Sequence, residues 1–322
     1  MSKRLKIILT ASVAGVFLLV FILATFYDYQ ISQAIARLTD GKYLSEDALG
    51  NFFEIIGEFP MYIIGVFAVA NLARASLQIK TLALKILLVC ICVGAGVFAY
   101  SLMINRAIEY VHEQAGTLNA VVDKTREFIE SWGVLIGSVV LMSLTFFLTF
   151  KIPEKYLSGL VAFSVAVLFT IALAQGVVQG VKVFMGRQRF RTMQLLDYKG
   201  FGDLVDYTPW YQINGARKVT EEMLNLGIAS DGYKSFPSGH TCAWAVIFAL
   251  TVLPDFLGVP EKKRVKIKGV LIVLTTLSVL FIAYTRIRVG AHFATDVLFA
   301  GAWTYLSVII SSYIAKKIVK QK

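Results

Sequence analysis

Charged residues are scarce in this chain of 322 residues, and that scarcity indicates the class of protein. Asp, Glu, Lys and Arg together make up 16% of the sequence, and hydrophobic residues make up 57%. Soluble domains usually carry about 25% charged residues. Apolar runs of about 20 residues, the length that a helix needs to cross a bilayer, recur along the whole chain. The composition excludes an ordinary soluble domain and predicts a polytopic membrane protein.

Cysteine is equally scarce, with Cys90, Cys92 and Cys242 all in apolar runs. Cys90 and Cys92 point in different directions if they share a helix, so we expect no disulfide. Internal repeats and low-complexity linkers are also lacking, and the chain is therefore treated as one membrane domain, residues 1–322. The lack of repeats weakens the case for a transporter, since many transporters are built from inverted repeats.

The apolar runs predict an all-α transmembrane bundle of about eight spans. The first run follows Lys3, Arg4 and Lys6 as a signal peptide would, but Leu5 to Phe26 is long and no small-residue cleavage site follows, so it is interpreted as a retained span. The predicted spans are residues 6–27, 59–77, 84–104, 132–150, 158–183, 238–257, 269–286 and 294–315.

The distribution of positive charge predicts the orientation. If the N-terminus is cytoplasmic, the five segments on that side carry 17 of the 32 Lys and Arg residues but only three of the 21 acidic residues. This bias follows the positive-inside rule and also places the C-terminus in the cytoplasm. The net charge of +11 therefore reflects membrane topology. No basic patch interleaved with aromatics is present, and we expect no nucleic-acid partner.

The long polar segments fall on the outer side in this topology. Residues 28–58 and 105–131 have helical patterns and are predicted to lie along or above the membrane interface. Residues 186–236 form the longest polar stretch, and Trp210 and Tyr211 in it suit the headgroup layer.

Three clusters of chemically capable residues also fall on the outer side. The first closes the fifth span, with Lys182, Arg187, Arg189 and Arg191; the second is Pro237-Ser238-Gly239-His240, which opens the sixth; the third joins the last two spans, with Arg286, His292 and Asp296. Taken alone, Arg187, Arg191 and Arg288 are interpreted as interfacial anchors, and a lone histidine at a helix mouth as a satisfied interface residue.

Taken together, the clusters predict an anion site. Lys182 and Arg189 lie two turns apart on one face if the helix continues that far, and an arginine fork donates two parallel hydrogen bonds to a phosphate. Pro237 suits a first helical turn, and the N–H groups at that helix end attract anions.

The third cluster supplies a possible nucleophile. His292 and Asp296 are i, i+4 neighbours, and a carboxylate on one imidazole nitrogen leaves the other as nucleophile or base. A metal site would have only His240, His292 and Asp296 as ligands, and the surrounding cations would repel the ion. We therefore expect no metal and no other cofactor.

In order and spacing, the three clusters resemble the motifs of the type 2 phosphatidic acid phosphatase superfamily, the integral-membrane lipid phosphate phosphatases. Those motifs are Lys, six residues, Arg-Pro; then Pro-Ser-Gly-His; then Ser-Arg, five residues, His, three residues, Asp. Phe190 stands at the position of the first motif's proline and Thr285 at that of the third motif's serine. The resemblance covers residues 158–316 as a catalytic core. The family core has six spans, which leaves residues 1–157 as additional N-terminal spans with helical outer loops.

The resemblance implies a role for each motif residue. Lys182, Arg189, Ser238, Gly239 and Arg286 would hold the phosphate. His292, oriented by Asp296, would attack phosphorus to form a phosphohistidine, and His240 would protonate the leaving oxygen before water hydrolyses the intermediate.

The resemblance further implies a lipid phosphate or pyrophosphate phosphatase acting at the extracytoplasmic face of a plasma or bacterial inner membrane. Its substrate would be a phosphorylated lipid such as polyprenyl pyrophosphate, phosphatidylglycerol phosphate or phosphatidic acid, and membrane lipids would surround it; protein partners are not indicated. Two alternatives stay open: a lipid phosphotransferase that uses the same site, and a non-catalytic anion-binding or transport protein. The related vanadate-dependent haloperoxidases are soluble, and the composition argues against them.

Overall fold

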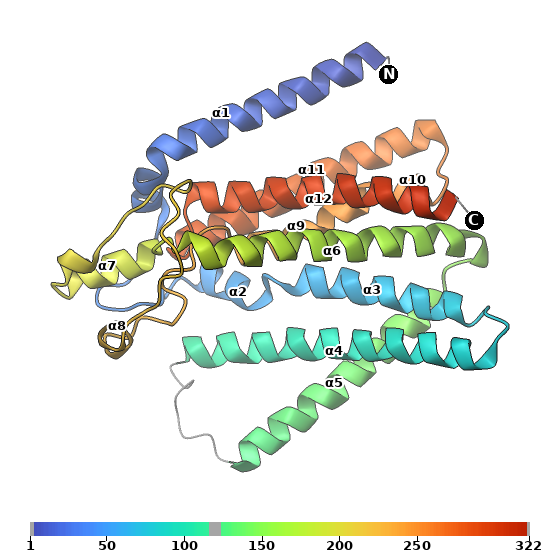
Figure 1. Ribbon diagram of the computed structural model, residues 1–322, viewed down its shortest axis with the longest axis horizontal. Coiled ribbons are helices and arrows are strands. Elements are labelled where there is room, and N and C mark those ends of the chain that lie inside the picture. The colour runs from blue at the N-terminus through green and yellow to red at the C-terminus, as the bar shows by residue number, and fades with distance from the viewer. Residues whose placement is uncertain (1–2, 116–123, 321–322) are drawn as a thin grey trace. The chain divides into compact units, whose positions relative to one another are not determined.

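A computed structural model describes residues 3–115 and 124–320, and every regular element in these ranges is a helix (Figure 1). The α-helices are α1 (Lys3–Ile35), α2 (Ala48–Ile56), α3 (Phe59–Ser76), α4 (Leu82–Gln114), α5 (Lys124–Phe150), α6 (Leu157–Met185), α7 (Phe190–Tyr198), α8 (Glu221–Asn225), α9 (Gly239–Ala245), α10 (Leu253–Phe256), α11 (Glu261–Arg288) and α12 (Ala294–Lys320). Short 3-10 helices are η1 (Glu154–Tyr156), η2 (Gly202–Leu204) and η3 (Val246–Thr251). The predicted all-α fold is confirmed.

Eight helical segments within the described ranges are long and apolar enough to cross a membrane, as predicted. They are Ala11–Ile35, Ala48–Ser76, Leu82–Gln114, Glu130–Phe150, Glu154–Tyr198, Gly239–Phe256, Glu261–Arg288 and Ala294–Ile318. The chain is therefore a multi-pass membrane protein. The cytoplasmic position of both termini stays a prediction.

The first span extends further than the sequence predicted. Instead of ending at residue 27, α1 continues to Ile35 through a kink at Tyr27 (φ −113°, ψ 17°). The extension is stabilised by packing, because Ile31 and Ile35 contact a buried apolar cluster that includes Ile287. As a result, Asp28 lies inside a span and not beyond its end.

The outer segments are only partly separate helices. α2 covers most of the helical pattern predicted within residues 28–58. By contrast, the first residues of segment 105–131 prolong α4 to Gln114, and residues 116–123 lie outside the described residues. The position of both segments relative to a membrane stays a prediction.

The sixth span is not one continuous α-helix. α9 gives way to the 3-10 helix η3 and then to α10. Within η3 the hydroxyl of Thr251 donates to the carbonyl of Phe248 (2.7 Å), and Pro254, which has no N–H to donate, stands in the first turn of α10. Pro237 precedes α9 by two residues, so its predicted place in the first helical turn is wrong.

The chain divides into two compact units, each made of several segments. Unit 1 comprises Met1–Gly50, Val178–Ser238 and Ala283–Ala300, and unit 2 comprises Asn51–Val177, Gly239–Ile282 and Gly301–Lys322. The interpretation of the chain as one membrane domain with its catalytic part at 158–316 stays a prediction.

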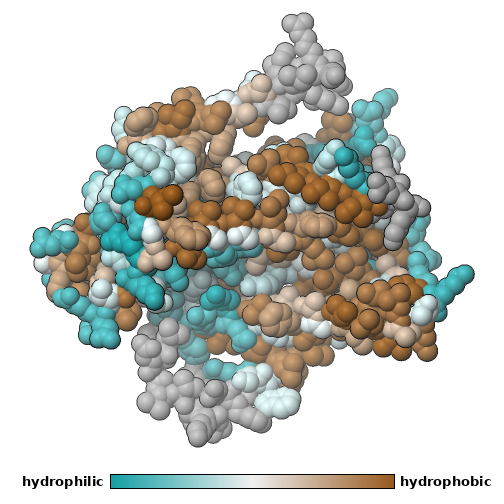
Figure 2. All heavy atoms as spheres, in the orientation of Figure 1, coloured by the Kyte–Doolittle hydropathy of each residue, from teal (hydrophilic) through white to brown (hydrophobic). Residues whose placement is uncertain are grey.

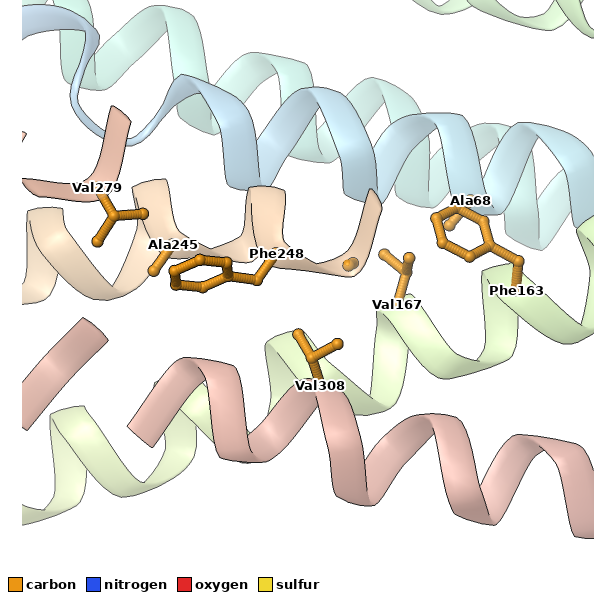
Figure 3. Packing of buried hydrophobic residues seen from close by; sticks show 8 residues of the cluster. Ala68, Phe163, Val167, Ala245, Phe248, Val279 and Val308 are labelled. Atoms are coloured by element: carbon orange, nitrogen blue, oxygen red, sulfur yellow. The ribbon is translucent and has the colours of Figure 1, made fainter. Parts of the chain in front are cut away.

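Unit 2 is a helical bundle held by small and aromatic side chains. α3 packs against α4, α5 and α9, and fully buried Ala68, Ala70 and Ala73 on α3 allow close approach of these helices. Figure 3 shows one of its cores, where Phe163 and Val167 of α6 meet residues of α3, α9, η3, α11 and α12.

Apolar side chains also cover the outside of the unit 2 helices. Figure 2 shows extended brown areas along the helices and teal residues around α7 and α8. On α11 the large exposed apolar residues include Val270, Val273, Leu274 and Leu277. A soluble protein rarely exposes so continuous an apolar surface, so lipid is the environment that these faces fit.

Arg74 on α3 is the one basic residue that interrupts the predicted second span, and the structure shows how its charge is stabilised. Its Nη1 donates to the carbonyl of Thr149, in the last turn of α5, and to that of Ile152, just beyond the helix (2.9 Å for Ile152). Its guanidinium lies over the ring of Phe150. A cation at a helix C-terminus is stabilised by the helix dipole. Arg74 therefore caps a neighbouring helix.

Candidate active site

The first cluster is divided between two elements. Lys182 lies in the last turn of α6, which ends at Met185, and Gly186 then adopts a positive φ of 52°. A Cβ on Gly186 would lie 2.3 Å from the carbonyl oxygen of Gly215, so the turn requires glycine. Lys182 and Arg189 are therefore not on one helical face, and that part of the prediction is wrong.

Phe190 opens α7 at the position where the related motif has proline. Arg189 precedes it in an extended conformation (φ −75°, ψ 149°), which is the region that a following proline would also favour. Phe190 is buried against the rings of Tyr29 and Phe293. Aromatic packing on one side of the segment takes the place of the restraint that proline would supply.

Backbone hydrogen bonds in unit 1 bring parts of all three sequence clusters together. The segment after α6 pairs with the loop before α9. The start of α7 pairs with the loop between α11 and α12, and the start of α12 pairs with the loop before α9. The bonds run from Arg189 N to Gly232 O (2.8 Å), Ser235 N to Arg187 O (3.1 Å), Arg191 N to Gly290 O (2.9 Å) and Ser238 N to Asp296 O (3.2 Å).

His292 is oriented by a backbone carbonyl that the sequence did not point to. Its Nδ1 lies 2.5 Å from the carbonyl oxygen of Ser235 and 3.8 Å from Asp296 Oδ2, which is too long for a hydrogen bond. Since a carbonyl oxygen only accepts, Nδ1 carries the proton and Nε2 carries the lone pair. The tautomer is the one that a nucleophilic Nε2 needs.

Asp296 acts on His292 through Ser235 and through the helix start. Its Oδ2 accepts from the Ser235 hydroxyl (2.6 Å) and from the backbone N–H of Phe293 (2.8 Å). A carboxylate that accepts from the N–H before its own helix is a stable cap for α12. Asp296 thus fixes both the residue whose carbonyl holds His292 and the loop that carries it.

Arg187 is buried between two carboxylates and is not the interfacial anchor that the sequence suggested. It is 1% exposed and pairs with Asp296 Oδ1 (2.5 Å) and Asp28 Oδ2 (2.8 Å). Its Nε donates to the carbonyl of Thr208 (2.8 Å), and its guanidinium stacks 4.1 Å from the centre of the Phe293 ring. The second carboxylate, Asp28, is one that sequence reasoning missed.

Asp28 completes this ion network from the first span. Its Oδ1 accepts from the backbone N–H of Thr295 (3.0 Å), and its Oδ2 accepts from the hydroxyl of the same residue. Ionisable residues within spans are rare and mark functional or structural networks, so the signal was present; the predicted end of the first span at residue 27 hid it.

Arg189 and Arg286, two of the predicted phosphate ligands, are buried in unit 1. Arg286 is fully buried, and Arg189 is 7% exposed. Arg189 Nη2 pairs with Asp231 Oδ2 (2.7 Å), and its Nε is buried without a hydrogen-bond partner among the residues that the structure describes. A buried N–H of this kind can donate to an anion at little further cost in desolvation.

Comparison with known protein families identifies the region that contains all these motifs. A family model described as the PAP2 superfamily matches residues 163–320. The C-terminal half of this chain belongs to the PAP2 superfamily. Searches of curated proteins and of solved structures found no match. Members of the PAP2 superfamily are phosphatases, and with its eight apolar helices the chain is a membrane phosphatase of this general kind.

Two PAP2 motif residues, Gly239 and His240, belong to unit 2. There His240 Nε2 lies 3.1 Å from the carbonyl oxygen of Glu54, and its ring lies 5.4 Å from that of Tyr110. A Cβ on Gly57 would approach His240 Cδ2 to 2.6 Å, so this glycine makes room for the ring. The catalytic role of His240 rests on the Pro-Ser-Gly-His motif and stays a prediction.

Two further basic residues of the PAP2 region, Arg191 and Arg288, have structural partners. Arg191 is buried with its guanidinium 4.5 Å from the centre of the Tyr43 ring, which makes its interpretation as an interfacial anchor wrong. Arg288 pairs with Asp47 (2.7 Å). Nowhere in the described ranges do three or more His, Cys, Asp or Glu side chains gather closely enough to hold a metal ion.

The environment of His292 predicts how it titrates. Burial lowers its pKa to about 3, and the charges of Arg189 and Lys182 act in the same direction, while Asp296 opposes them. A lowered pKa means that the ring stays neutral until the pH falls close to that value. We therefore expect His292 to be neutral from about pH 8 down to pH 5, whereas an ordinary histidine titrates near pH 6.5.

NMR of protein labelled with ¹³C-histidine tests this expectation directly, because the chain has only three histidines. The ring signal that disappears in His292→Asn should keep its chemical shift across that pH range. A shift of that signal with a midpoint near pH 6.5 would show that the ring is not held neutral.

Proposed function

We propose that this protein is a lipid phosphate or lipid pyrophosphate phosphatase that works through a phosphohistidine on His292. The observation that carries the proposal is one contact of His292: its Nδ1 is bonded to the Ser235 carbonyl, which leaves the lone pair on Nε2. Arg189 and Lys182 lie near enough for their charges to lower the pKa of the ring. A neutral nucleophile beside fixed cations suits attack on a phosphate.

In the proposed reaction, the lone pair of His292 Nε2 attacks phosphorus and the bond to the leaving oxygen breaks. His240, which follows Ser238 by two residues, donates a proton to that oxygen; a histidine acid of this kind is typically worth about 10²–10⁴-fold in rate. Water then attacks the phosphohistidine and gives a proton to His240, and the P–N bond breaks to release inorganic phosphate. The enzyme is returned unchanged.

Fixed cations stabilise the charge that develops in this reaction. Lys182, Arg189 and Arg286 would bind the phosphate oxygens, together with the Ser238 hydroxyl and the Gly239 N–H. Preorganised donors of this kind need not reorganise during the reaction. We propose that they remove the need for a metal ion.

The membrane setting supports a lipid as the substrate. A phosphate carried at the headgroup layer would reach the site while its apolar tail stayed in the bilayer. The positive-inside distribution of Lys and Arg supports a site on the extracytoplasmic face of a plasma or bacterial inner membrane. Candidate substrates are polyprenyl pyrophosphate, phosphatidylglycerol phosphate and phosphatidic acid.

The test is phosphate release from a panel of these lipids by the purified full-length protein in detergent, with and without EDTA. We expect release from at least one lipid phosphate and less than a twofold change with EDTA. No release from any of them would overturn the proposal, and activity lost with EDTA and restored by a divalent cation would overturn metal independence. Phosphate transferred to an added acceptor lipid would identify a phosphotransferase, and transport in proteoliposomes without phosphate release would identify a transporter.

A further inference from the structure

Asp231 forms an ion pair with Arg189, one of the predicted phosphate ligands in unit 1. Its Oδ2 lies 2.7 Å from Arg189 Nη2. Its Oδ1 lies 3.9 Å from Arg191 Nη2 and accepts a hydrogen bond from the Tyr43 hydroxyl (3.3 Å). None of the three sequence motifs includes Asp231, and the proposed reaction gives it no role. A carboxylate in this place holds the same guanidinium that a substrate phosphate would use.

Hydrogen bonds hold the backbone around Asp231, while its side chain reaches solvent. Gly232 O accepts from Arg189 N (2.8 Å), and Lys234 N donates to Asp231 O (2.8 Å). The side chain itself is 37% exposed, compared with 8% for its partner Arg189. A change of rotamer would therefore move the carboxylate into water without disturbing the segments that carry Arg189 and His292.

The electrostatics around Asp231 match those of the proposed phosphate position. Burial alone would raise the pKa of Asp231, but the charges of Arg189, Arg191 and Lys182 hold it well below its ordinary value. The carboxylate is consequently ionised at any physiological pH. Two of the three cations that stabilise it, Arg189 and Lys182, are predicted phosphate ligands, so carboxylate and phosphate would compete for the same field.

We propose that Asp231 is an internal competitor that selects doubly charged phosphate groups over singly charged ones. This inference rests on the proposed function and concerns the same site. Exchanging the Asp231 carboxylate for a phosphodiester, which carries one negative charge, replaces one unit of charge by another and gains no Coulomb energy. A phosphomonoester dianion brings twice the charge and displaces the carboxylate. Asp231 thus keeps the abundant phosphodiester headgroups of the membrane away from Arg189.

Replacing Asp231 by asparagine tests the proposal with a change of charge at nearly constant volume. In the purified full-length protein we expect the inhibition constant of inorganic phosphate to fall about tenfold in Asp231→Asn, equivalent to ~1.4 kcal/mol. We also expect phosphatidylglycerol, a phosphodiester, to become an inhibitor at concentrations that leave the unmodified protein unaffected. If Asp231 served only to position Arg189, its loss would weaken phosphate binding, so the direction of the change separates the two roles.

A matched control is Asp206→Asn, which removes the same charge from unit 1 at an aspartate paired with Arg217. We expect its inhibition by phosphate and by phosphatidylglycerol to be unchanged. A second variant, Tyr43→Phe, removes a hydroxyl that donates to Asp231 Oδ1 over 3.3 Å. Because this hydrogen bond is longer than the usual O–H···O range, its loss should lower the phosphate inhibition constant by only about twofold to threefold, less than the loss of a full hydrogen bond to a charged group would. An unchanged or higher inhibition constant in both Asp231→Asn and Tyr43→Phe would overturn the proposal.

Binding measured without turnover separates this inference from the proposed function. The rise in melting temperature on adding inorganic phosphate reports binding whether or not any lipid is hydrolysed. If the unmodified protein releases no phosphate from any lipid, the proposed function fails. A larger phosphate-induced rise in Asp231→Asn than in Asp206→Asn would still support competition at Arg189, and an equal or smaller rise would refute it.

Discussion

Replacing His292 by alanine is expected to lower phosphate release by on the order of 10⁴-fold or more, as removal of a nucleophile does in enzymes whose catalytic residues act as a unit. The expectation follows from the geometry: Nδ1 is committed to the Ser235 carbonyl, and burial keeps the ring neutral by lowering its pKa to about 3. The nearest carboxylate, Asp296, is committed to Arg187, the Ser235 hydroxyl and the Phe293 N–H. Phosphate release from the best lipid substrate, at saturating concentration, measures the effect.

The control for this experiment is His112→Ala, which removes the histidine that lies outside the PAP2 motifs. His112 is on α4, 3.5 Å from Glu130, and its loss should leave the rate within about twofold. Both variants should elute as monodisperse protein with melting temperatures close to that of the unmodified protein. If His292→Ala kept near-normal turnover, His292 would not be the nucleophile. Phosphate trapped on the unmodified protein in acid-labile, base-stable form, and absent from His292→Ala, would identify the covalent intermediate.

Replacing Arg187 by alanine is expected to destabilise the protein by about 3–5 kcal/mol, because it leaves Asp28 and Asp296 buried without their cation. Both carboxylates are 1% exposed or less, so water cannot take the place of the guanidinium. Arg187→Lys should recover little of this loss, since an ammonium group cannot pair with both carboxylates and also stack on Phe293. Unfolding in detergent, followed by fluorescence or by loss of monodispersity on heating, measures the change.

Arg217→Ala provides the comparison for this loss. Arg217 also pairs with a carboxylate, that of Asp206, but both side chains are partly exposed, and such pairs contribute at most about 1 kcal/mol. A variant with Asp28→Asn and Arg187→Met together should be more stable than Arg187→Met alone, because one of the two uncompensated charges is gone. Equal stability of Arg187→Ala and Arg217→Ala would show that the buried network does not hold unit 1 together.

Much of the architecture could be predicted from local sequence because a bilayer imposes a simple requirement. A chain that crosses it must satisfy its backbone hydrogen bonds within each segment and expose apolar side chains, so eight runs of apolar residues predicted eight helices. The ends of these helices were less predictable. α1 continues past Tyr27 because Ile31 and Ile35 find buried partners, and α6 stops at Met185 because Gly186 turns the chain.

The motif residues were recognisable because their types, order and spacings resemble the motifs of a known family. Lys182, Arg189, Ser238, Gly239, His240, Arg286, His292 and Asp296 could all be proposed from the chain alone. Their catalytic roles remain predictions until the variants are measured. What the sequence suggested about how they are held was different: Asp296 was expected to bond directly to His292, and the structure separates the two by 3.8 Å.

By itself, then, the sequence determined the membrane class, the helical fold and the identity of the motif residues, because hydropathy and residue type are local properties. Only the tertiary structure decided what surrounds His292 and Arg189. The bond between His292 and the Ser235 carbonyl, the Asp28–Arg187–Asp296 network and the Asp231–Arg189 pair each join residues more than 40 positions apart in the chain. A backbone carbonyl has no residue type to recognise, and a buried ion pair exists only once folding has excluded water from both partners.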